Sequence, residues 1–135
     1  MRNLFLFLML CLPACNNQQP IKSDQPVVPE AGQIGIYYFR SPLRCETCNA
    51  VESIVKRELE GKYAEKVKSG ELVFRQFNLD DPGVAEFALR FGVVFKSLII
   101  LKEGEQTNLT NEAFLYALSN PGKLEMLLEQ TIDQY

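Results

Sequence analysis

The sequence predicts an α/β sandwich in which helices flank a four-stranded mixed sheet. Three observations lead to this fold class. Apolar strand-like runs alternate with amphipathic helical segments in the order strand, helix, strand, helix, strand, strand, helix. A helix joins the first two strands, which is the connection that parallel strands need. A Glu103-Gly104 turn joins the last two strands as an antiparallel hairpin.

Each predicted strand is a short apolar or alternating segment bounded by turn residues. Gln33–Phe39 is rich in β-branched and aromatic residues, which indicates a buried strand. Glu71–Leu79 alternates between two faces, and Ser97–Leu101 is apolar enough for a central position in the sheet. We expect a short fourth strand near Glu105–Leu109, after the hairpin turn.

The predicted first helix is long and turns one apolar face toward the core. Apolar residues recur along it at helical spacing, and Ser69-Gly70 provides a stop signal. Gly61 is a candidate kink within it, because glycine destabilises a helix interior. The expected core face comprises Val51, Ile54, Val55, Leu59, Tyr63 and Val67.

Capping residues predict where the later helices begin. Asp81 is the expected N-cap of the next helix, with Pro82 in its first turn, and Gly92 is expected to end it. Asn111 is expected to cap a short segment, and Pro121 is expected to open the last helix. The core face of that last helix should comprise Leu124, Leu127, Leu128 and Ile132.

Length and composition indicate one globular domain and exclude several kinds of function. The chain has 135 residues, 47% of them hydrophobic and 23% charged, with a formal net charge of −3. This balance is too acidic for a protein that follows a phosphate backbone, so we expect no nucleic-acid partner. The absence of histidine removes the commonest general base and the usual metal ligand. We expect a monomer.

The N-terminal region is typical of an exported lipoprotein. Residues 1–14 combine one basic residue with an apolar run that is too short to cross a bilayer. Leu12-Pro13-Ala14-Cys15 resembles the bacterial lipobox, in which the cysteine receives lipid. We therefore predict a signal peptide over 1–14 and a lipid on Cys15 that anchors the protein to a membrane in the bacterial periplasm. Ordinary signal-peptidase cleavage, with Cys15 as an incidental thiol, is the alternative.

A polar, proline-containing segment follows the predicted lipid site. Residues 15–32 hold three prolines and show neither helical nor alternating periodicity. We expect a flexible linker over 15–32 and one folded domain over 33–135.

Cys45 and Cys48 form a Cys-x-x-Cys pair just after the first predicted strand, where the first helix begins. A spacing of three residues on a helix places both sulfur atoms on one face, within disulfide reach. The free amides and the dipole at a helix start stabilise an anion, which favours the attacking thiolate of Cys45. Arg44 adds a positive charge nearby, whereas Glu46 opposes it.

Other roles for this cysteine pair depend on different chemistry. A structural disulfide is credible in an exported protein, although such a short loop gains the least stability from a crosslink. A structural zinc site needs four ligands and the pair supplies two, so we expect no metal centre. Haem attachment would need histidine where Asn49 stands. Chelation of trivalent arsenic or a soft metal by two thiolates stays open.

Several segments of residues 33–135 carry a resemblance to a known superfamily. They are Tyr37-Tyr38-Phe39, Arg44-Cys45-Glu46-Thr47-Cys48, Phe91-Gly92-Val93, Lys96-Ser97-Leu98 and the hairpin at Leu101-Lys102-Glu103-Gly104-Glu105. With the strand order, they resemble the thioredoxin superfamily, which implies a thioredoxin-like sandwich. More narrowly, the chain is similar to the small thioredoxin-like proteins of the ArsF family, a label that implies reduction of nitrophenyl arsenicals.

The chain departs from the usual thioredoxin pattern at the site. Arg44 stands where a typical thioredoxin has tryptophan, and Glu46 and Thr47 replace Gly-Pro between the cysteines. Alignment on the hairpin puts Lys96 at the place of the cis-proline, which implies that Lys96 lies near Cys45 and lowers its pKa by charge. The first strand holds no acidic residue to serve as a buried proton acceptor.

The sequence supports hypotheses from three functional classes. In the first, an oxidoreductase, Cys45 attacks a disulfide or thiophilic substrate and Cys48 resolves the adduct, without an organic cofactor. Its expected partner is a membrane thiol-electron carrier or a disulfide-containing protein. In the second, the dithiol binds or carries trivalent arsenic or a soft metal. The third is a redox-silent interaction domain.

Overall fold

The computed structural model describes residues 24–43 and 45–135. The predicted signal peptide over 1–14, the lipid site at Cys15 and the proposed charge at Arg44 lie outside the described residues. Among the residues that the structure describes, no helix is both long enough and apolar enough to cross a membrane.

Four strands form one mixed sheet, as the sequence predicted. They are β1 (Ile34–Arg40), β2 (Leu72–Asn78), β3 (Ser97–Lys102) and β4 (Glu105–Asn108). The sheet order is β2-β1-β3-β4, with β1 parallel to β2 and antiparallel to β3. β3 and β4 form the predicted hairpin, whose turn residues Glu103 and Gly104 both have positive φ.

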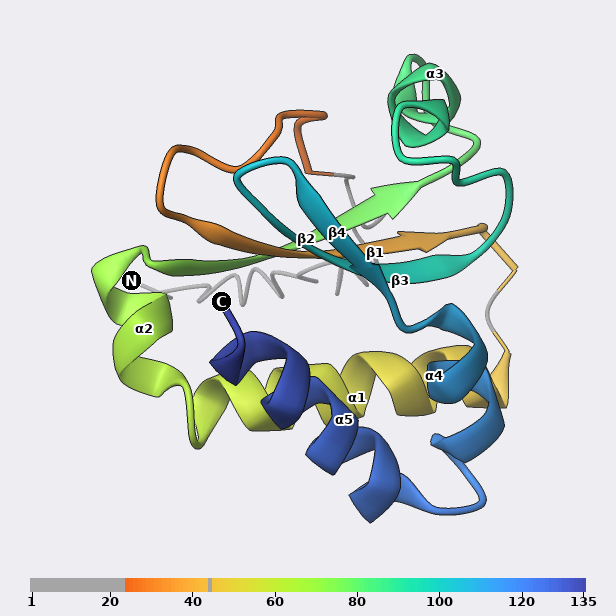
Figure 1. Ribbon diagram of the computed structural model, residues 1–135. Helices are drawn as coiled ribbons and strands as arrows, with labels where there is room; N and C mark the ends of the chain where they lie inside the picture. Colours follow the sequence, from red (N-terminus) through yellow and green to blue (C-terminus); the bar gives the residue numbers. More distant parts are fainter. Residues whose placement is uncertain (1–23, 44) are drawn as a thin grey trace, which may run out of the picture.

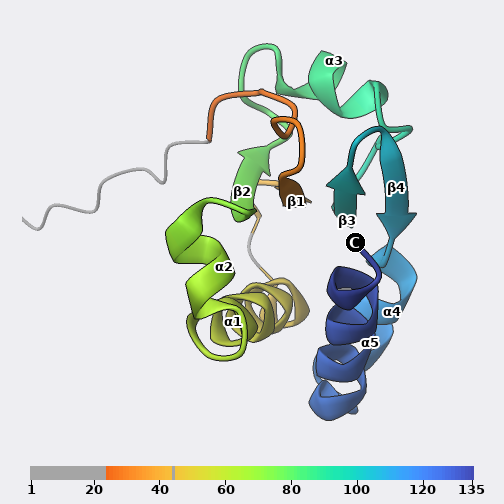
Figure 2. The ribbon, with the colours of Figure 1, turned by 60° about the vertical axis from the view of Figure 1, so that its left-hand side comes forward.

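Helices cover both faces of the sheet. They are α1 (Glu46–Glu60), α2 (Ala64–Ser69), α3 (Val84–Leu89), α4 (Thr110–Tyr116) and α5 (Pro121–Asp133). α1, α4 and α5 lie together on one side, and α3 lies on the other (Figure 1). The rotated view in Figure 2 shows the same three layers, with the strands between α3 and the group of α1, α4 and α5.

Alternation along the central strand divides the core into two clusters. Ile36 and Tyr38 of β1 belong to the cluster that packs against α1, α4 and α5. Tyr37 and Phe39, the intervening residues, belong to the cluster that packs against α3. All four side chains are at most 1% exposed. The period of two in a strand thus places successive aromatic rings in opposite layers, and core packing explains them.

The segment predicted as one long helix is divided into α1 and α2 at Gly61. The Gly61 amide donates to the Arg57 carbonyl, and the chain then turns before α2 begins. Tyr63 remains buried, but Val67 is 40% exposed, so the prediction that Val67 faces the core was wrong. The turn at Gly61 breaks the helical periodicity on which that prediction relied.

Two predicted caps were also wrong, and one predicted helix start is confirmed. Gly83, with a φ of 80°, occupies the N-cap position of α3. Asp81 lies in the preceding turn, where its carboxylate accepts from the Asn78 side chain at 2.9 Å. Asn111 lies inside the first turn of α4, after the N-cap Leu109. Pro121 does begin α5.

Residues 24–32, which the sequence assigned to the linker, contact the sheet. The Asp24 amide donates to the Gln76 carbonyl at 2.9 Å, and the Gln76 amide donates to the Asp24 carboxylate at 2.7 Å. Tyr37 donates its hydroxyl proton to the Val27 carbonyl. Because β2 is an edge strand with unpaired backbone groups, this segment satisfies some of them. Among the residues that the structure describes, contacts with the sheet therefore begin at Asp24 rather than at Gln33.

Candidate active site

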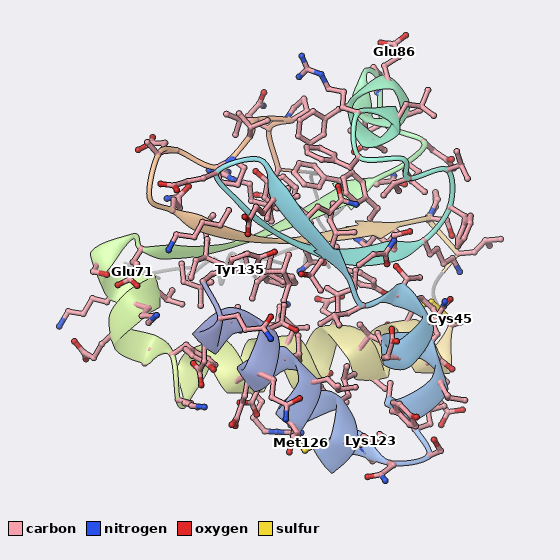
Figure 3. The ribbon with its side chains drawn as sticks, in the orientation of Figure 1. Cys45, Glu71, Glu86, Lys123, Met126 and Tyr135 are labelled. Carbon is pink, nitrogen blue, oxygen red and sulfur yellow. A yellow bond between two sulfur atoms is a disulfide. The ribbon has the colours of Figure 1, made fainter. Side chains whose placement is uncertain are left out.

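Cys45 and Cys48 form a disulfide at the start of α1. Cys45 is the N-cap residue, with an extended backbone, and its Cα lies 5.0 Å from that of Cys48. Figure 3 shows Cys45 at the end of α1 nearest β3 and α4. The chain must leave β1 and turn into α1 there, so the strand end and the helix start together position the pair. The predicted placement of the pair at a helix start is confirmed.

The two sulfur atoms have different surroundings. Cys45 Sγ accepts a hydrogen bond from the Cys48 amide at 3.1 Å, which is one of the free amides of the first helical turn. Cys45 is partly exposed, whereas Cys48 is only 6% exposed. A soluble thiol can therefore approach the sulfur of Cys45 more readily than that of Cys48.

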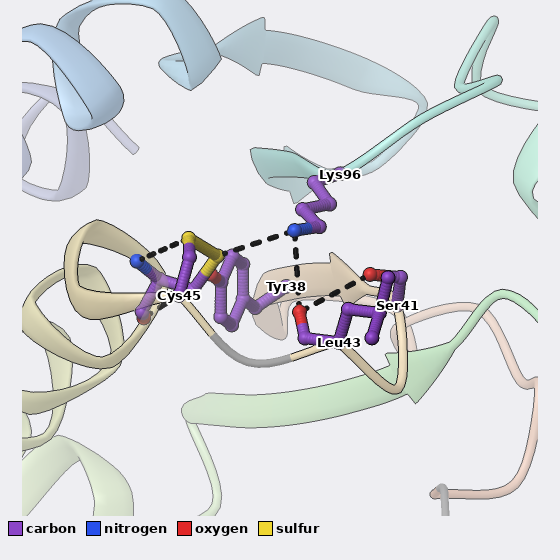
Figure 4. The surroundings of a disulfide bond; sticks show 6 residues. Tyr38, Ser41, Leu43, Cys45 and Lys96 are labelled. Carbon is purple, nitrogen blue, oxygen red and sulfur yellow. Dashed lines mark hydrogen bonds between the residues drawn. A yellow bond between two sulfur atoms is a disulfide. The ribbon is translucent and has the colours of Figure 1, made fainter.

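Lys96 reaches the disulfide from the residue just before β3. Its Nζ lies 3.5 Å from Cys48 Sγ and donates to the Leu43 carbonyl at 3.3 Å (Figure 4). The alignment implied a position near Cys45, and the structure places the ammonium beside the disulfide, in contact with Cys48 Sγ and with Cys45 Sγ one bond further away. The antiparallel pairing of Phe39 with Ser97 explains the approach, because it brings the start of β3 beside the end of β1.

Sequence reasoning missed three residues that lie close to Cys48. Tyr38 donates its hydroxyl proton to the Cys48 carbonyl at 3.2 Å. Arg40 is only 8% exposed, and its Nε has no hydrogen-bond partner in the part of the chain that the structure describes. Both residues, with Glu52, line a cavity of about 10 Å³ beside Cys48. The signal for Glu52 was its i+4 spacing from Cys48, which puts both on one helix face.

Apolar surface lies beside the disulfide. A groove of about 600 Å³ runs from Lys96 to α4, lined by Phe95, Lys96, Thr110, Asn111, Phe114 and Leu115. Phe95 is 63% exposed, and Leu43, in the loop before Cys45, is 79% exposed. Side chains this apolar offer contact area to the apolar part of a substrate or partner.

The chemistry of the site is set by sulfur. Within residues 24–43 and 45–135, no group of three or more His, Cys, Asp or Glu residues is arranged to hold a metal ion. The pair can interconvert between disulfide and dithiol, and in the dithiol state it offers two sulfur ligands on one helix face.

Comparison with known proteins clarifies the fold. No family model matches the chain, and no curated protein does either. Among solved structures, the germline-specific thioredoxin Deadhead from Drosophila melanogaster matches with a TM-score of 0.50 and 18% identity, over 73% of this chain and 81% of that one. The fold is thioredoxin-like. A Fasciola hepatica thioredoxin matches with a TM-score of 0.46 and 17% identity, over 77% of this chain and 82% of that one.

The fold shows where in the domain the cysteine pair lies, which the Cys-x-x-Cys motif by itself does not. The chain combines this fold with a Cys-x-x-Cys disulfide at the first helix start. At the position that the sequence alignment gave to a cis-proline, Lys96 directly precedes β3 and contacts the second sulfur. No peptide bond within the described residues is cis.

Proposed function

We propose that the protein is an exported, membrane-anchored thiol–disulfide oxidoreductase that uses Cys45 and Cys48. The observation that carries this proposal is the placement of the disulfide on the first turn of α1, with Cys45 accessible and Cys48 behind it. An amide donates to Cys45 Sγ, and the same amide would stabilise its thiolate in the reduced protein. The thioredoxin-like fold supports the proposal.

In the proposed reaction, the reduced protein transfers two electrons to a disulfide substrate. The Cys45 thiolate attacks one sulfur of the substrate and forms a mixed disulfide, while the other substrate sulfur leaves as a thiolate. Cys48 then loses its proton and attacks Cys45 Sγ, which restores the Cys45–Cys48 disulfide and releases the second substrate thiol. Reduction of the protein follows the same steps in reverse, with electrons from a membrane thiol-electron carrier as the proposed donor.

Trapping the mixed disulfide tests this assignment. We expect Cys48→Ser to accumulate a mixed disulfide with glutathione on Cys45, because Cys48 is no longer there to resolve it. The matched variant Cys45→Ser should accumulate far less, since Cys48 is buried. Peptide mass mapping after incubation with oxidised glutathione separates the two, because it distinguishes an adduct at the Cys45–Cys48 pair from one on Cys11 or Cys15. The proposal fails if the wild-type chain shows no reversible dithiol–disulfide conversion under mild reductant.

A second candidate function is dithiol capture of trivalent arsenic or a soft metal, in line with the ArsF resemblance. The apolar groove beside Lys96 favours it, because the aromatic ring of an aryl arsenical could pack against the apolar side chains there. The two functions differ in turnover. Tight binding of trivalent arsenic by the reduced protein, without insulin-disulfide reduction, would favour capture. Catalytic insulin reduction would favour the oxidoreductase.

A further inference from the structure

We propose that Lys96 makes Cys48 the leaving thiolate when the disulfide is reduced, and so biases the protein toward accepting electrons. This inference rests on the proposed oxidoreductase function and adds a direction to it. Sequence alignment associated Lys96 with the attacking cysteine. The geometry makes Cys48 Sγ the direct contact of the ammonium, which adds an effect on the second sulfur.

The ammonium of Lys96 contacts both Cys48 and the loop before Cys45. Nζ lies 3.5 Å from Cys48 Sγ, and the same ammonium donates to the Leu43 carbonyl at 3.3 Å. Figure 4 shows the lysine reaching across from the start of β3 to both partners. The Leu43 carbonyl belongs to the loop that leads into Cys45, so Lys96 is oriented by backbone next to the reacting sulfurs.

The burial of Cys48 increases the importance of this ammonium. A thiolate at Cys48, which is 6% exposed, would have little water around it, and an uncompensated buried anion is unfavourable. A positive charge within hydrogen-bonding distance offsets this penalty. The amide that contacts Cys45 Sγ stabilises the other sulfur. Each sulfur of the pair therefore has its own polar neighbour that would stabilise a negative charge on it.

The reaction follows from the different exposure of the two sulfurs. A thiolate of a donor thiol attacks the accessible Cys45 Sγ, forms a donor–Cys45 disulfide and breaks the Cys45–Cys48 bond. The electron pair of that bond remains on Cys48, beside the ammonium of Lys96. A second donor thiolate then attacks the donor sulfur and releases the Cys45 thiolate. Two electrons pass from two donor thiols, which become a disulfide, to the protein.

The charge of Lys96 changes both the rate and the equilibrium of this reaction. An ammonium interacts strongly with a thiolate but weakly with a neutral disulfide sulfur, so it stabilises the reduced protein. A redox pair whose reduced form is stabilised is a better oxidant. The same interaction improves Cys48 as a leaving group, and disulfide exchange is faster when the leaving thiolate is more stable.

The test compares the redox equilibrium of charge-removing and charge-keeping variants. We expect Lys96→Met to lower the equilibrium constant for reduction by glutathione about tenfold, which corresponds to about 30 mV for a two-electron couple. Glutathione should also reduce the Lys96→Met protein more slowly than the wild type. Lys96→Arg should stay close to the wild type, because it keeps the positive charge. Lys68→Met is the matched control, since it removes one positive charge from α2, at the end of the fold away from Cys45 (Figure 3).

Two results would overturn the inference. One is a Lys96→Met equilibrium constant equal to that of the wild type while the disulfide still converts reversibly, which leaves the proposed function standing. The other is an equal loss in Lys96→Arg and Lys96→Met, which would show that charge is not the cause. Thermal unfolding of the oxidised variants verifies that each is folded. A wild-type protein without reversible conversion would instead remove the proposed function itself.

Discussion

Side chains from β1, from α1 and from the residue before β3 lie around Cys48. Tyr38 reaches the Cys48 carbonyl from β1, and Lys96 reaches its sulfur from the start of β3. Glu52, one turn further along α1, lines the small cavity beside Cys48. Local helix spacing alone could have indicated Glu52. The contact of Lys96 depends on the pairing of β1 with β3, which brings this lysine beside a residue 48 positions away in the sequence. Tyr38 lies only 10 positions before Cys48, and its contact depends on how the chain turns from β1 into α1.

Tyr37 is the residue whose environment most directly predicts a pH effect. Its ring is fully buried, and its hydroxyl donates to the Val27 carbonyl. Burial raises the pKa of Tyr37 from 10.0 to about 12, although Arg75 acts in the opposite direction. Between these two pH values the unfolded chain binds fewer protons than the folded one. Stability should therefore fall as pH rises from 10 through 12.

We predict that Tyr37→Phe reduces this alkaline loss of stability. Phenylalanine has no proton to lose, so the free energy of unfolding should decline less steeply between pH 10 and 12 than in the wild type. Tyr63, whose burial also raises its pKa to about 12, should preserve part of the decline. Urea unfolding at several pH values measures the slope. Equal slopes in the two proteins would show that Tyr37 does not contribute.

At the scale of elements, the central strand β1 contacts both the cysteine site and the N-terminal segment over 24–32. Its last residues lead into the cysteine loop, and its register with β3 brings Lys96 across. Nearer its start, Gly35 lies against Pro29 of the segment over 24–32. A Cβ added at Gly35 would lie 2.6 Å from Pro29 Cγ and 2.8 Å from Tyr37 Cε1. The segment therefore packs closely on this strand because Gly35 has no side chain.

We predict that Gly35→Ala destabilises the domain by about 1–3 kcal/mol, the usual range for overpacking a core. It should also loosen the segment over 24–32, which limited proteolysis would detect as new cleavage there. Gly122→Ala is the matched control, because an added Cβ in the first turn of α5 meets nothing within 4 Å. That variant should be neutral or up to about 1 kcal/mol more stable. A Gly35→Ala protein as stable and protease-resistant as the wild type would contradict the prediction.

At the scale of the whole molecule, the sheet separates a layer that contains the disulfide from a layer that contains the N-terminal segment. The layer of α1, α4 and α5 carries the disulfide and forms one wall of the apolar groove. The opposite layer contains α3 and the segment over 24–32, which lie on the same side of the sheet (Figure 1). Within the described part of the chain, contacts with the sheet begin at Asp24, which follows Cys15 by nine positions in the sequence. In the membrane-anchored form that we propose, lipid on Cys15 would tether the domain through its N-terminal segment.

We predict that Cys15→Ser in the full chain abolishes incorporation of labelled fatty acid in a bacterial host. The protein should then move from the membrane fraction to the soluble fraction, because a single serine cannot take the thioether-linked lipid. Cys11→Ser is the matched control, since it alters a cysteine inside the apolar run without removing the proposed lipid site. Cys15→Ser protein that remains in the membrane fraction as fully as the wild type would refute the anchoring proposal.

Short-range patterns in the sequence were enough to predict much of the fold. The four strands, the hairpin at Glu103-Gly104, the start of α5 at Pro121 and the cysteine pair at a helix start all depend on neighbouring residues. Such features are determined by local backbone preferences and by side-chain periodicity. The errors at Val67 and Asp81 arose where one glycine, Gly61 or Gly83, redirected the chain.

Only the tertiary structure decided which sulfur Lys96 contacts and which residues surround Cys48. The sequence alone determined that a Cys-x-x-Cys pair lies at a helix start and that a lysine precedes the third strand. The pairing of β1 with β3 then placed that lysine 3.5 Å from Cys48 Sγ. Contacts between strands depend on register and on packing of the whole core, and neither is encoded in the spacing of nearby residues.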